Sequence, residues 1–252
     1  MILTTRKRLN FLKIADVYFA ETTEVDLPPV DIAQFVQFQK RTTRSTEFLT
    51  LHVDLTQDEG ALFAQLRKNT RYEVRRAENK DGVVASSCCA PSEQDLAAFG
   101  RFYDSFAEAK NLPRCNLPKL AAQRDHDALW LTSAASPDGD VLCYHAYLVD
   151  PPRCRLLHSA SHFRASEDPT SRSLIGRANR YLHWKDILLF KQHGFFIYDL
   201  GGLSTNENDP KLKNINEFKR GFGGAEVVEY NSLAPRTPLG WLAFLYLRTR
   251  EP

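Results

Sequence analysis

The spacing of apolar and polar positions predicts short strands and amphipathic helices in alternation along the chain. Leu49, Leu51 and Val53 alternate with polar neighbours, which is the period of a strand that buries one face. Phe63 and Leu66 begin an apolar stripe with helical spacing. The same patterns predict strands at 11–20, 32–39, 48–54, from 83 onward, and at 128–134, 141–149, 153–161, 195–200 and 226–230. They predict helices at 56–80, 93–109, 117–124, 171–193, 214–218 and 239–247.

Capping and turn residues add detail to this pattern. Thr56 with Glu59 three residues later forms a capping box, and Ser92 is the expected N-cap of the next helix. Turn residues at 137–140 and 151–152 separate three strands, which we expect to form an antiparallel meander. The order of elements predicts an α+β protein with a mixed, mostly antiparallel sheet flanked by helices.

Composition and charge narrow the class of protein. The chain has 252 residues, of which 43% are hydrophobic, so it is long enough for one large domain or two small ones. We expect a strand-rich segment at 1–56 and a main domain at 57–252. The net charge of +2 means that any site for a polyanion must be local. Five scattered cysteines without a CxxC pair indicate reduced thiols, and the apolar runs are too short for a membrane segment, so we expect a cytoplasmic protein.

A lysine near the C-terminal end is the main candidate for chemistry. Lys219 lies between the pair Gly201-Gly202 and the glycines that follow at 221, 223 and 224. Because glycine breaks helices, we expect Lys219 to lie on a stiff turn beside the sheet. An ammonium group held in this way suits acyl transfer, in which negative charge builds on an oxygen atom.

A run of cations in the predicted helix at 56–80 is a candidate phosphate site. Arg67, Arg71 and Arg75 recur at every fourth residue and therefore share one helical face, with Arg76 beside them. Such a face either grips the phosphates of a nucleotide sugar, a lipid diphosphate or a tRNA, or is a solvated basic surface. Tyr72 lies within the run, where it either stacks on a base or sugar or is buried.

Two further residues are candidates for proton transfer or for orienting a substrate. His158 is near the end of a meander strand, as a general base for an attacking amine or as a structural histidine. Asp199 precedes the Gly201-Gly202 turn, and it either orients an amine or a ribose hydroxyl or stabilises the turn. The acidic and histidine residues at 125–127 point to alternate faces of a strand, so we expect no metal site.

Four segments together resemble the FemAB-like branch of the GNAT acyltransferase superfamily, which includes the peptidoglycan-bridge aminoacyltransferases. They are the basic helix at 66–77, the helix from 174 to His193-Gly194, the strand and turn at 198–202, and the turn at 218–223. The resemblance covers about residues 60–230 and implies a GNAT-like core, with 1–56 as part of a second such half. It implies that Phe218 and Lys219 lie near the site of transfer, with Gly201 and Gly202 lining the substrate site.

The resemblance also implies a position for the donor. Residues 173–178 take the place of the pyrophosphate loop of the superfamily, and Gly176 and Ala178 fit its small-residue positions. Ser173 replaces the first basic residue of that loop, while Arg172 stands one position early. Backbone N–H groups at the start of this helix would then bind a pyrophosphate.

These features lead to three hypotheses of function. The leading one is an N-acyltransferase that forms an amide on an amino-sugar or amino-acid acceptor of cell-wall or polysaccharide precursors, with aminoacyl-tRNA as donor. The second is an acyl-coenzyme A-dependent N-acyltransferase of polysaccharide or secondary-metabolite biosynthesis. The third is a non-catalytic module that binds a phosphorylated glycan precursor. Because the donor is a co-substrate, we expect no bound cofactor, with tRNA and a phosphorylated sugar or amino-acid acceptor as partners.

Overall fold

The chain folds into two units, each described by itself. The computed structural model describes residues 1–162, 168–206 and 208–248. The first unit combines residues 1–50 with 227–252, and the second comprises residues 51–226. The predicted boundary at residue 56 lies close to the start of the second unit, whereas the C-terminal segment from 227 belongs to the first unit.

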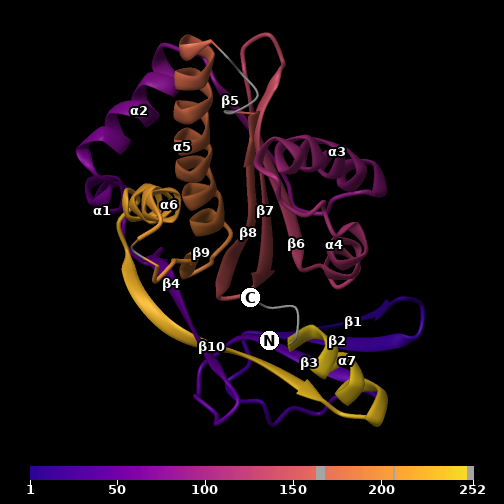
Figure 1. Cartoon of the computed structure of the whole chain (residues 1–252). Coiled ribbons are helices and arrows are strands. Elements are labelled where there is room, and N and C mark those ends of the chain that lie inside the picture. Colours follow the sequence, from indigo (N-terminus) through magenta and orange to yellow (C-terminus); the bar gives the residue numbers. More distant parts are fainter. Residues whose placement is uncertain (163–167, 207, 249–252) are drawn as a thin grey trace. The chain divides into compact units, whose positions relative to one another are not determined.

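The first unit is a small sheet with one helix (Figure 1). It contains β1 (Ile2–Arg8), β2 (Leu12–Tyr18), β3 (Ile32–Phe38), most of β10 (Ala225–Pro235) and α7 (Pro238–Arg248). Strand β2 pairs antiparallel with β1 and parallel with β3, and β3 pairs antiparallel with β10. Val17, Ala33 and Phe35 are buried in its core. Strand β1 was not predicted, because its cationic and threonine positions hide the alternation that marks a strand.

The second unit is built on the predicted meander. Its strands follow the order β4-β9-β8-β7-β6-β5, with only residues 51–54 of β4 in this unit. Their bounds are Thr46–Asp54 for β4, Val84–Cys88 for β5, Leu129–Ala135 for β6, Val141–Asp150 for β7, Arg153–Ser161 for β8 and Ile197–Gly202 for β9. Strands β5 to β8 pair antiparallel with their neighbours, while β8 and β9 are parallel. The prediction of a mixed, mostly antiparallel sheet is therefore confirmed.

Helices cover both faces of this sheet, as predicted (Figure 1). On one face lie α1 (Glu59–Gln65), α2 (Lys68–Asn79), α5 (Pro169–Gln192) and α6 (Pro210–Arg220); on the other lie α3 (Glu93–Lys110) and α4 (Leu117–Arg124). Helix α3 packs Leu96 and Phe99 against Leu129 and Leu131 of β6. The predicted cap of α3 is confirmed, because Ser92 and Asp95 form a full capping box.

The helix predicted over 56–80 is wrong as a single element. Leu66 and Arg67 have ψ angles of 138° and 149°, which interrupt the helix between α1 and α2. The backbone N–H of Arg67 donates instead to the carbonyl of Gly221, 3.0 Å away, so a distant segment takes the bond that a continuous helix would use. The N-cap of α1 is Asp58, and Thr56 donates its hydroxyl to Asp54.

The expected turn around Lys219 is also wrong. Lys219 lies in the last turn of α6, which begins with Asp209 as N-cap and Pro210 in its first turn and ends at Gly221. The glycines therefore follow the helix and stop it, with Gly223 and Gly224 at positive φ. These glycines therefore end the helix after Lys219, and they do not prevent the residues before Lys219 from being helical.

Candidate active site

The pairing of strands β8 and β9 ends in the middle of the second unit. They run parallel, and their ladder joins Arg153–Arg155 to Ile197–Asp199 and goes no further along the described strands. Gly201 has φ +73°, and a Cβ placed on it would lie only 3.1 Å from the carbonyl oxygen of Leu156. Glycine at this position therefore allows the two backbones to stay close just where their pairing ends.

Lys219 lies on α6, and its side chain reaches the place where the β8–β9 ladder ends. Its Nζ donates to the carbonyl oxygen of Gly202 over 2.6 Å. A Cβ on Gly201 would lie 3.9 Å from Nζ, so the lysine and the predicted glycine pair are brought together. Burial lowers the pKa of Lys219 from 10.5 to about 8; the attraction of Asp199 opposes this shift, and the charge of Arg155 adds to it.

Phe218 holds the end of α6 against α5. Its ring lies under the guanidinium of Arg180 at 4.8 Å and contacts the rings of His183 and Phe222 at centroid distances of 5.6 and 5.4 Å. These contacts orient the last turn of α6. In the structure Phe218 is thus a positioning residue for its neighbour Lys219.

Asp199 stabilises the turn after β9. Its Oδ1 accepts a hydrogen bond from the backbone N–H of Gly201 at 2.8 Å, and its Oδ2 accepts one from Arg153. Burial alone would raise the pKa of Asp199, but the hydrogen bond from His52 and the charge of Arg153 outweigh it and hold that pKa well below its usual range. Asp199 is therefore a buried carboxylate that fixes the turn, and its charge also favours the ammonium form of Lys219.

His158 is placed on the other face of the sheet. Its ring packs against Tyr103 and Phe99 of α3, at centroid distances of 4.8 and 6.1 Å. Burial, with the charges of Arg155 and Lys119, lowers the pKa of His158 to about 4. The structure thus favours the structural reading, because a histidine with so low a pKa is a weak proton acceptor near neutral pH.

Gly176 and Ala178 do not form a phosphate-binding loop. Helix α5 begins at Pro169, so both residues lie inside the helix, where backbone N–H groups bond to carbonyls one turn earlier. The start of the helix is capped by Asp168, whose carboxylate accepts from the N–H of Ser171 at 2.8 Å. Arg172 lies in this first turn and is exposed. A pyrophosphate would meet a carboxylate at this helix end.

The first half of the basic run has structural partners. Arg71 donates from one guanidinium nitrogen to the carbonyls of Ala64 and Leu66, at 2.7 and 2.6 Å, and so caps the end of α1. Arg67 pairs with Glu217 of α6 at 2.5 Å. Both side chains therefore join helices within the second unit, and a phosphate would have to displace these bonds.

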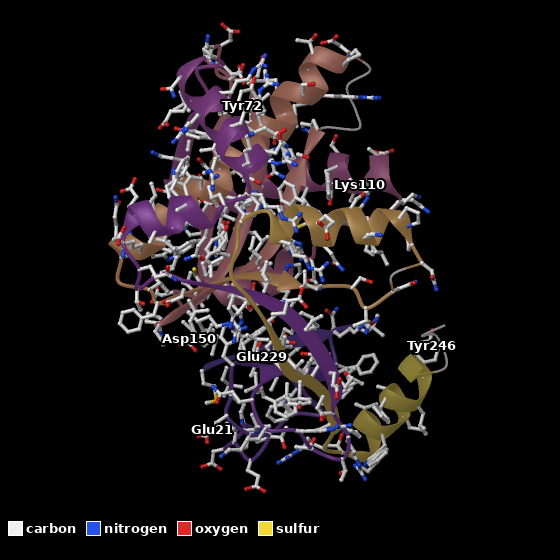
Figure 2. The ribbon with its side chains drawn as sticks, turned by 90° about the vertical axis from the view of Figure 1, so that its left-hand side faces the viewer. Glu21, Tyr72, Lys110, Asp150, Glu229 and Tyr246 are labelled. Carbon is white, nitrogen blue, oxygen red and sulfur yellow. The ribbon has the colours of Figure 1, made fainter. Side chains whose placement is uncertain are left out.

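The second half of the run faces outward. Arg75 lies over the ring of Phe63 at 5.0 Å, and Arg76 donates to the hydroxyl of Tyr72 at 3.3 Å and lies 3.8 Å from Asp81. The side chain of Tyr72 is 58% exposed, so the alternative that it is buried is wrong. Figure 2 labels Tyr72 on α2. Stacking of a base or sugar on Tyr72 stays a prediction.

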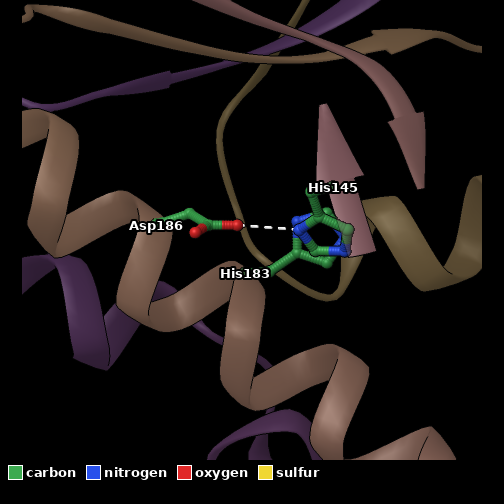
Figure 3. Close-up of side chains that lie close together, drawn as sticks. All are labelled: His145, His183 and Asp186. Atoms are coloured by element: carbon green, nitrogen blue, oxygen red, sulfur yellow. Dashed lines mark hydrogen bonds and ion pairs between the residues drawn. The ribbon is translucent and has the colours of Figure 1, made fainter. Parts of the chain in front are cut away.

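A buried polar network beside this site was not found from the sequence. Asp186 on α5 accepts from the hydroxyl of Tyr147 at 2.6 Å and lies 2.7 Å from Nδ1 of His145 on β7 (Figure 3). The Tyr147 hydroxyl lies 2.7 Å from that of Tyr198, which in turn lies 2.7 Å from Nδ1 of His183. Burial, with Asp186 next, raises the pKa of both tyrosines. The chain links β7, β9 and α5 through hydrogen bonds shielded from water.

The number of protons that each group can donate sets the direction of each hydrogen bond in this network. Because Tyr147 gives its only proton to Asp186, the short contact between the tyrosines requires Tyr198 to donate to Tyr147. Tyr198 then accepts from Nδ1 of His183, which leaves a lone pair on Nε2 of that ring. Burial and the nearby His145 lower the pKa of His183 well below its usual value, which is consistent with this neutral tautomer. The described surroundings hold no hydrogen-bond partner for Nε2.

His145, His183 and Asp186 also have the residue types of a metal site, but their geometry fits a hydrogen-bonded chain better. The 2.7 Å between Nδ1 of His145 and the Asp186 oxygen is a hydrogen-bond length. Two ligands about 2.0 to 2.1 Å from one tetrahedral zinc ion would lie further apart than this. The sequence does carry a signal for the pair on α5, because His183 and Asp186 are three residues apart and therefore share a helical face.

The class of fold follows from this arrangement. The second unit combines a mostly antiparallel sheet that has helices on both faces with a lysine beside the end of the β8–β9 ladder. No family model and no curated protein matches the sequence. Among solved structures, FemX is similar with a TM-score of 0.64 and 11% identity over 95% of this chain and 85% of that one.

Two further solved structures share the fold. One is the C-terminal domain of a putative lysylphosphatidylglycerol synthetase from Agrobacterium fabrum, with a TM-score of 0.58, 15% identity, and coverage of 98% of this chain and 84% of that one. The other is L-PGS from Bacillus licheniformis, with a TM-score of 0.53, 14% identity, and coverage of 86% and 72%. The predicted resemblance to the FemAB-like branch is confirmed at the level of the fold.

Within residues 1–162, 168–206 and 208–248, each helix is too short or too polar to cross a membrane.

Replacing Arg71 separates its capping role from a role in phosphate binding. We expect Arg71→Ala to lower the free energy of unfolding by about 1 to 2 kcal/mol, because the carbonyls at the end of α1 lose their donor. Arg75→Ala, on the exposed side of the same helix, is the matched control and should change it by less than about 0.5 kcal/mol. Urea unfolding followed by circular dichroism measures both, and equal effects would contradict the capping role.

Replacing Asp186 tests the buried network. We expect Asp186→Asn to lower the free energy of unfolding by about 2 to 3 kcal/mol, because Tyr147 and His145 lose a charged acceptor in the core. Tyr147→Phe removes one donor and should cost less. The double variant should cost less than the sum of the two single changes, since both belong to one network. Additive costs in denaturant unfolding would show that the two groups are independent.

Proposed function

We propose that this chain is an aminoacyltransferase that forms an amide bond on an amine acceptor. The observation that carries the proposal is the half-buried ammonium of Lys219, held 2.6 Å from the Gly202 carbonyl beyond the end of the β8–β9 ladder. Aminolysis of an ester passes through a tetrahedral intermediate with a negatively charged oxygen, which a fixed cation in a desolvated place stabilises. The similarity of the fold to FemX and to a putative lysylphosphatidylglycerol synthetase domain supports transfer of an aminoacyl group.

The reaction needs no covalent enzyme intermediate. The acceptor nitrogen attacks the carbonyl carbon of the donor ester, and a C–N bond forms. The C–O bond to the ribose of the tRNA then breaks, and the proton lost by the amine ends on the departing ribose oxygen. Lys219 would stabilise the transient oxyanion, while Phe218 and Asp199 would keep that lysine in place. Positioning of the two substrates supplies much of the remaining rate.

We assign aminoacyl-tRNA as the donor in preference to acyl-coenzyme A. The start of α5, where the coenzyme's pyrophosphate would bind, carries the carboxylate of Asp168 as its cap. Hydrogen bonds from Ser171 lower the pKa of Asp168, so this carboxylate is charged near neutral pH. It would repel a pyrophosphate. As acceptor we propose an amino-sugar or amino-acid group of a cell-wall or polysaccharide precursor.

Protection against heat distinguishes the donors. The protein is incubated separately with charged tRNA, uncharged tRNA and acetyl-coenzyme A, and its melting temperature is measured. We expect charged tRNA to raise the melting temperature most. Protection by acetyl-coenzyme A alone would establish the second hypothesis in place of the first. Transfer is then followed as radiolabelled amino acid that becomes stable to mild base, because an amide survives conditions that hydrolyse an ester.

Replacing Lys219 tests its role in the reaction. We expect Lys219→Met to reduce the single-turnover rate of transfer by about 10² to 10³, with little change in the affinity for charged tRNA. Lys213→Met, on the same helix but exposed, is the matched control and should retain the full rate. If the Lys219 variant transfers at the normal rate, the oxyanion role is wrong. A wild-type protein that binds both substrates without transfer would support the non-catalytic hypothesis.

The pH dependence should follow the charge of Lys219. Because its pKa is lowered to about 8, the ammonium form is lost as pH rises through that value. We therefore expect the ratio of wild-type to Lys219→Arg transfer rates to fall above pH 8, since arginine stays charged and the ratio cancels titration of the acceptor. The folded protein also binds fewer protons than the unfolded chain between about pH 8 and 10.5, so the amount by which this group destabilises the fold decreases as pH rises across that window. A flat rate ratio would contradict the assignment.

A further inference from the structure

Helix α7 of the first unit is apolar on nearly all sides. Its sequence from Pro238 to Arg248 is PLGWLAFLYLR, which contains one cation and no carboxylate. A helix that is hydrophobic all round is normally buried on all sides. This one is not, because five of its large side chains are exposed: Leu239, Trp241, Leu242, Leu245 and Tyr246.

The inner side of α7 is fixed to the sheet of its own unit. Gly240 lies directly on the backbone of Asp31, where a Cβ would come within 1.9 Å of the carbonyl oxygen. Ala243 packs against the buried cluster of Leu12, Ile14 and Ile32. The hydroxyl of Thr237, just before the helix, donates to the Asp31 carboxylate at 2.7 Å. The helix is therefore anchored by its small residues, and its orientation on this unit is set.

The outer side of α7 is one continuous apolar face. At 3.6 residues per turn, the five exposed side chains fall on an arc of about 160°. Leu242, at the middle of this face, is 68% exposed, and Leu245 and Tyr246 are each 55% exposed. Figure 2 labels Tyr246 on this helix. Water-exposed leucines concentrated on one face mark a site of interaction.

Cations lie at the edges of this face. The guanidinium of Arg44 lies 5.8 Å from the ring centroid of Trp241. Arg236 precedes the helix in the sequence and is exposed. The nearby carboxylate of Asp31 is already engaged by Thr237 and by the backbone N–H of Lys13. An apolar face that includes tryptophan and tyrosine, with arginines at its margins, matches the boundary between acyl chains and anionic headgroups.

We propose that α7 binds the surface of an anionic lipid bilayer, lying in the plane of the interface with Leu242 and Leu245 toward the acyl chains. A second copy of the chain fits this face less well. Specific protein interfaces engage roughly 20 to 30 residues on each side, whereas this face has five large side chains on one short helix. The proposal stands on the first unit alone and does not require that the chain be an acyltransferase.

Vesicle sedimentation tests the proposal with the full chain. Vesicles of phosphatidylcholine mixed with phosphatidylglycerol are compared with vesicles of phosphatidylcholine alone. We expect partition into the anionic vesicles that weakens as salt is raised. The double variant Leu242→Ser/Leu245→Ser should reduce this partition about tenfold or more. The matched control is Phe196→Ser/Ile215→Ser, which removes exposed apolar side chains of the second unit and should partition as the wild type does.

A fluorescence measurement shows which helix enters the lipid. Of the three tryptophans, Trp241 is the one on α7. We expect a blue shift of tryptophan emission on adding anionic vesicles, and its loss in Trp241→Phe. Circular dichroism and the melting temperature show whether each variant is folded.

Three outcomes would overturn the proposal. They are absence of binding by the wild type, equal binding by the α7 double variant, or a concentration-dependent dimer that the double variant abolishes without any binding to vesicles. The last of these would assign the face to a second copy of the chain.

Discussion

The hydrogen bond from Lys219 to the Gly202 carbonyl is the contact on which the proposed site depends. It joins the last turn of α6 to the end of β9, beyond the point where the hydrogen-bonded ladder of β9 with β8 ends. Removing part of an ammonium's water shell is costly, and here a carbonyl and the nearby charge of Asp199 offset only part of that cost, in line with the lowered pKa of Lys219. A cation so incompletely paired gains more from a transient oxyanion than a well-solvated surface lysine does.

The residues that support this lysine are linked to one another. Phe218 packs on His183, and His183 bonds to Tyr198, which lies next to Asp199 on β9. The hydrogen-bonded chain from His183 to Asp186 fixes α5 against the sheet, and every proton in it points toward that carboxylate. Such a network tolerates few alternative arrangements, because any unpaired member would be left without water. Rigid support of this kind is what positioning of a reactive group requires.

Much of the local structure could be predicted because its causes are local. The meander at 128–161 and the capping box at Ser92 follow from alternation, turn residues and a side chain that reaches its own helix. The predictions that are wrong share one feature, because each misplaces the point where a helix begins, ends or is interrupted. Arg67 interrupts a helix where its N–H bonds to Gly221, and Lys219 is helical because α6 begins at the cap Asp209, upstream of the helix predicted at 214–218. The resemblance placed a pyrophosphate loop at 173–178, but Gly176 and Ala178 lie inside α5, which begins at Pro169.

The sequence by itself determined the class of fold, the meander, and the association of a lysine near residue 219 with the glycine pair at 201–202. Each rests on spacing, turn chemistry or an ordered set of segments that is visible along the chain. Only the tertiary structure decided the roles of the charged residues. Arg71 caps a helix, Asp199 holds a turn, His158 is packed in an aromatic cluster, and His145 lies beside Asp186. His158 and His145 depend on desolvation and on partners dozens of residues away, whereas Arg71 and Asp199 bond to backbone groups two to seven residues away whose geometry the fold sets.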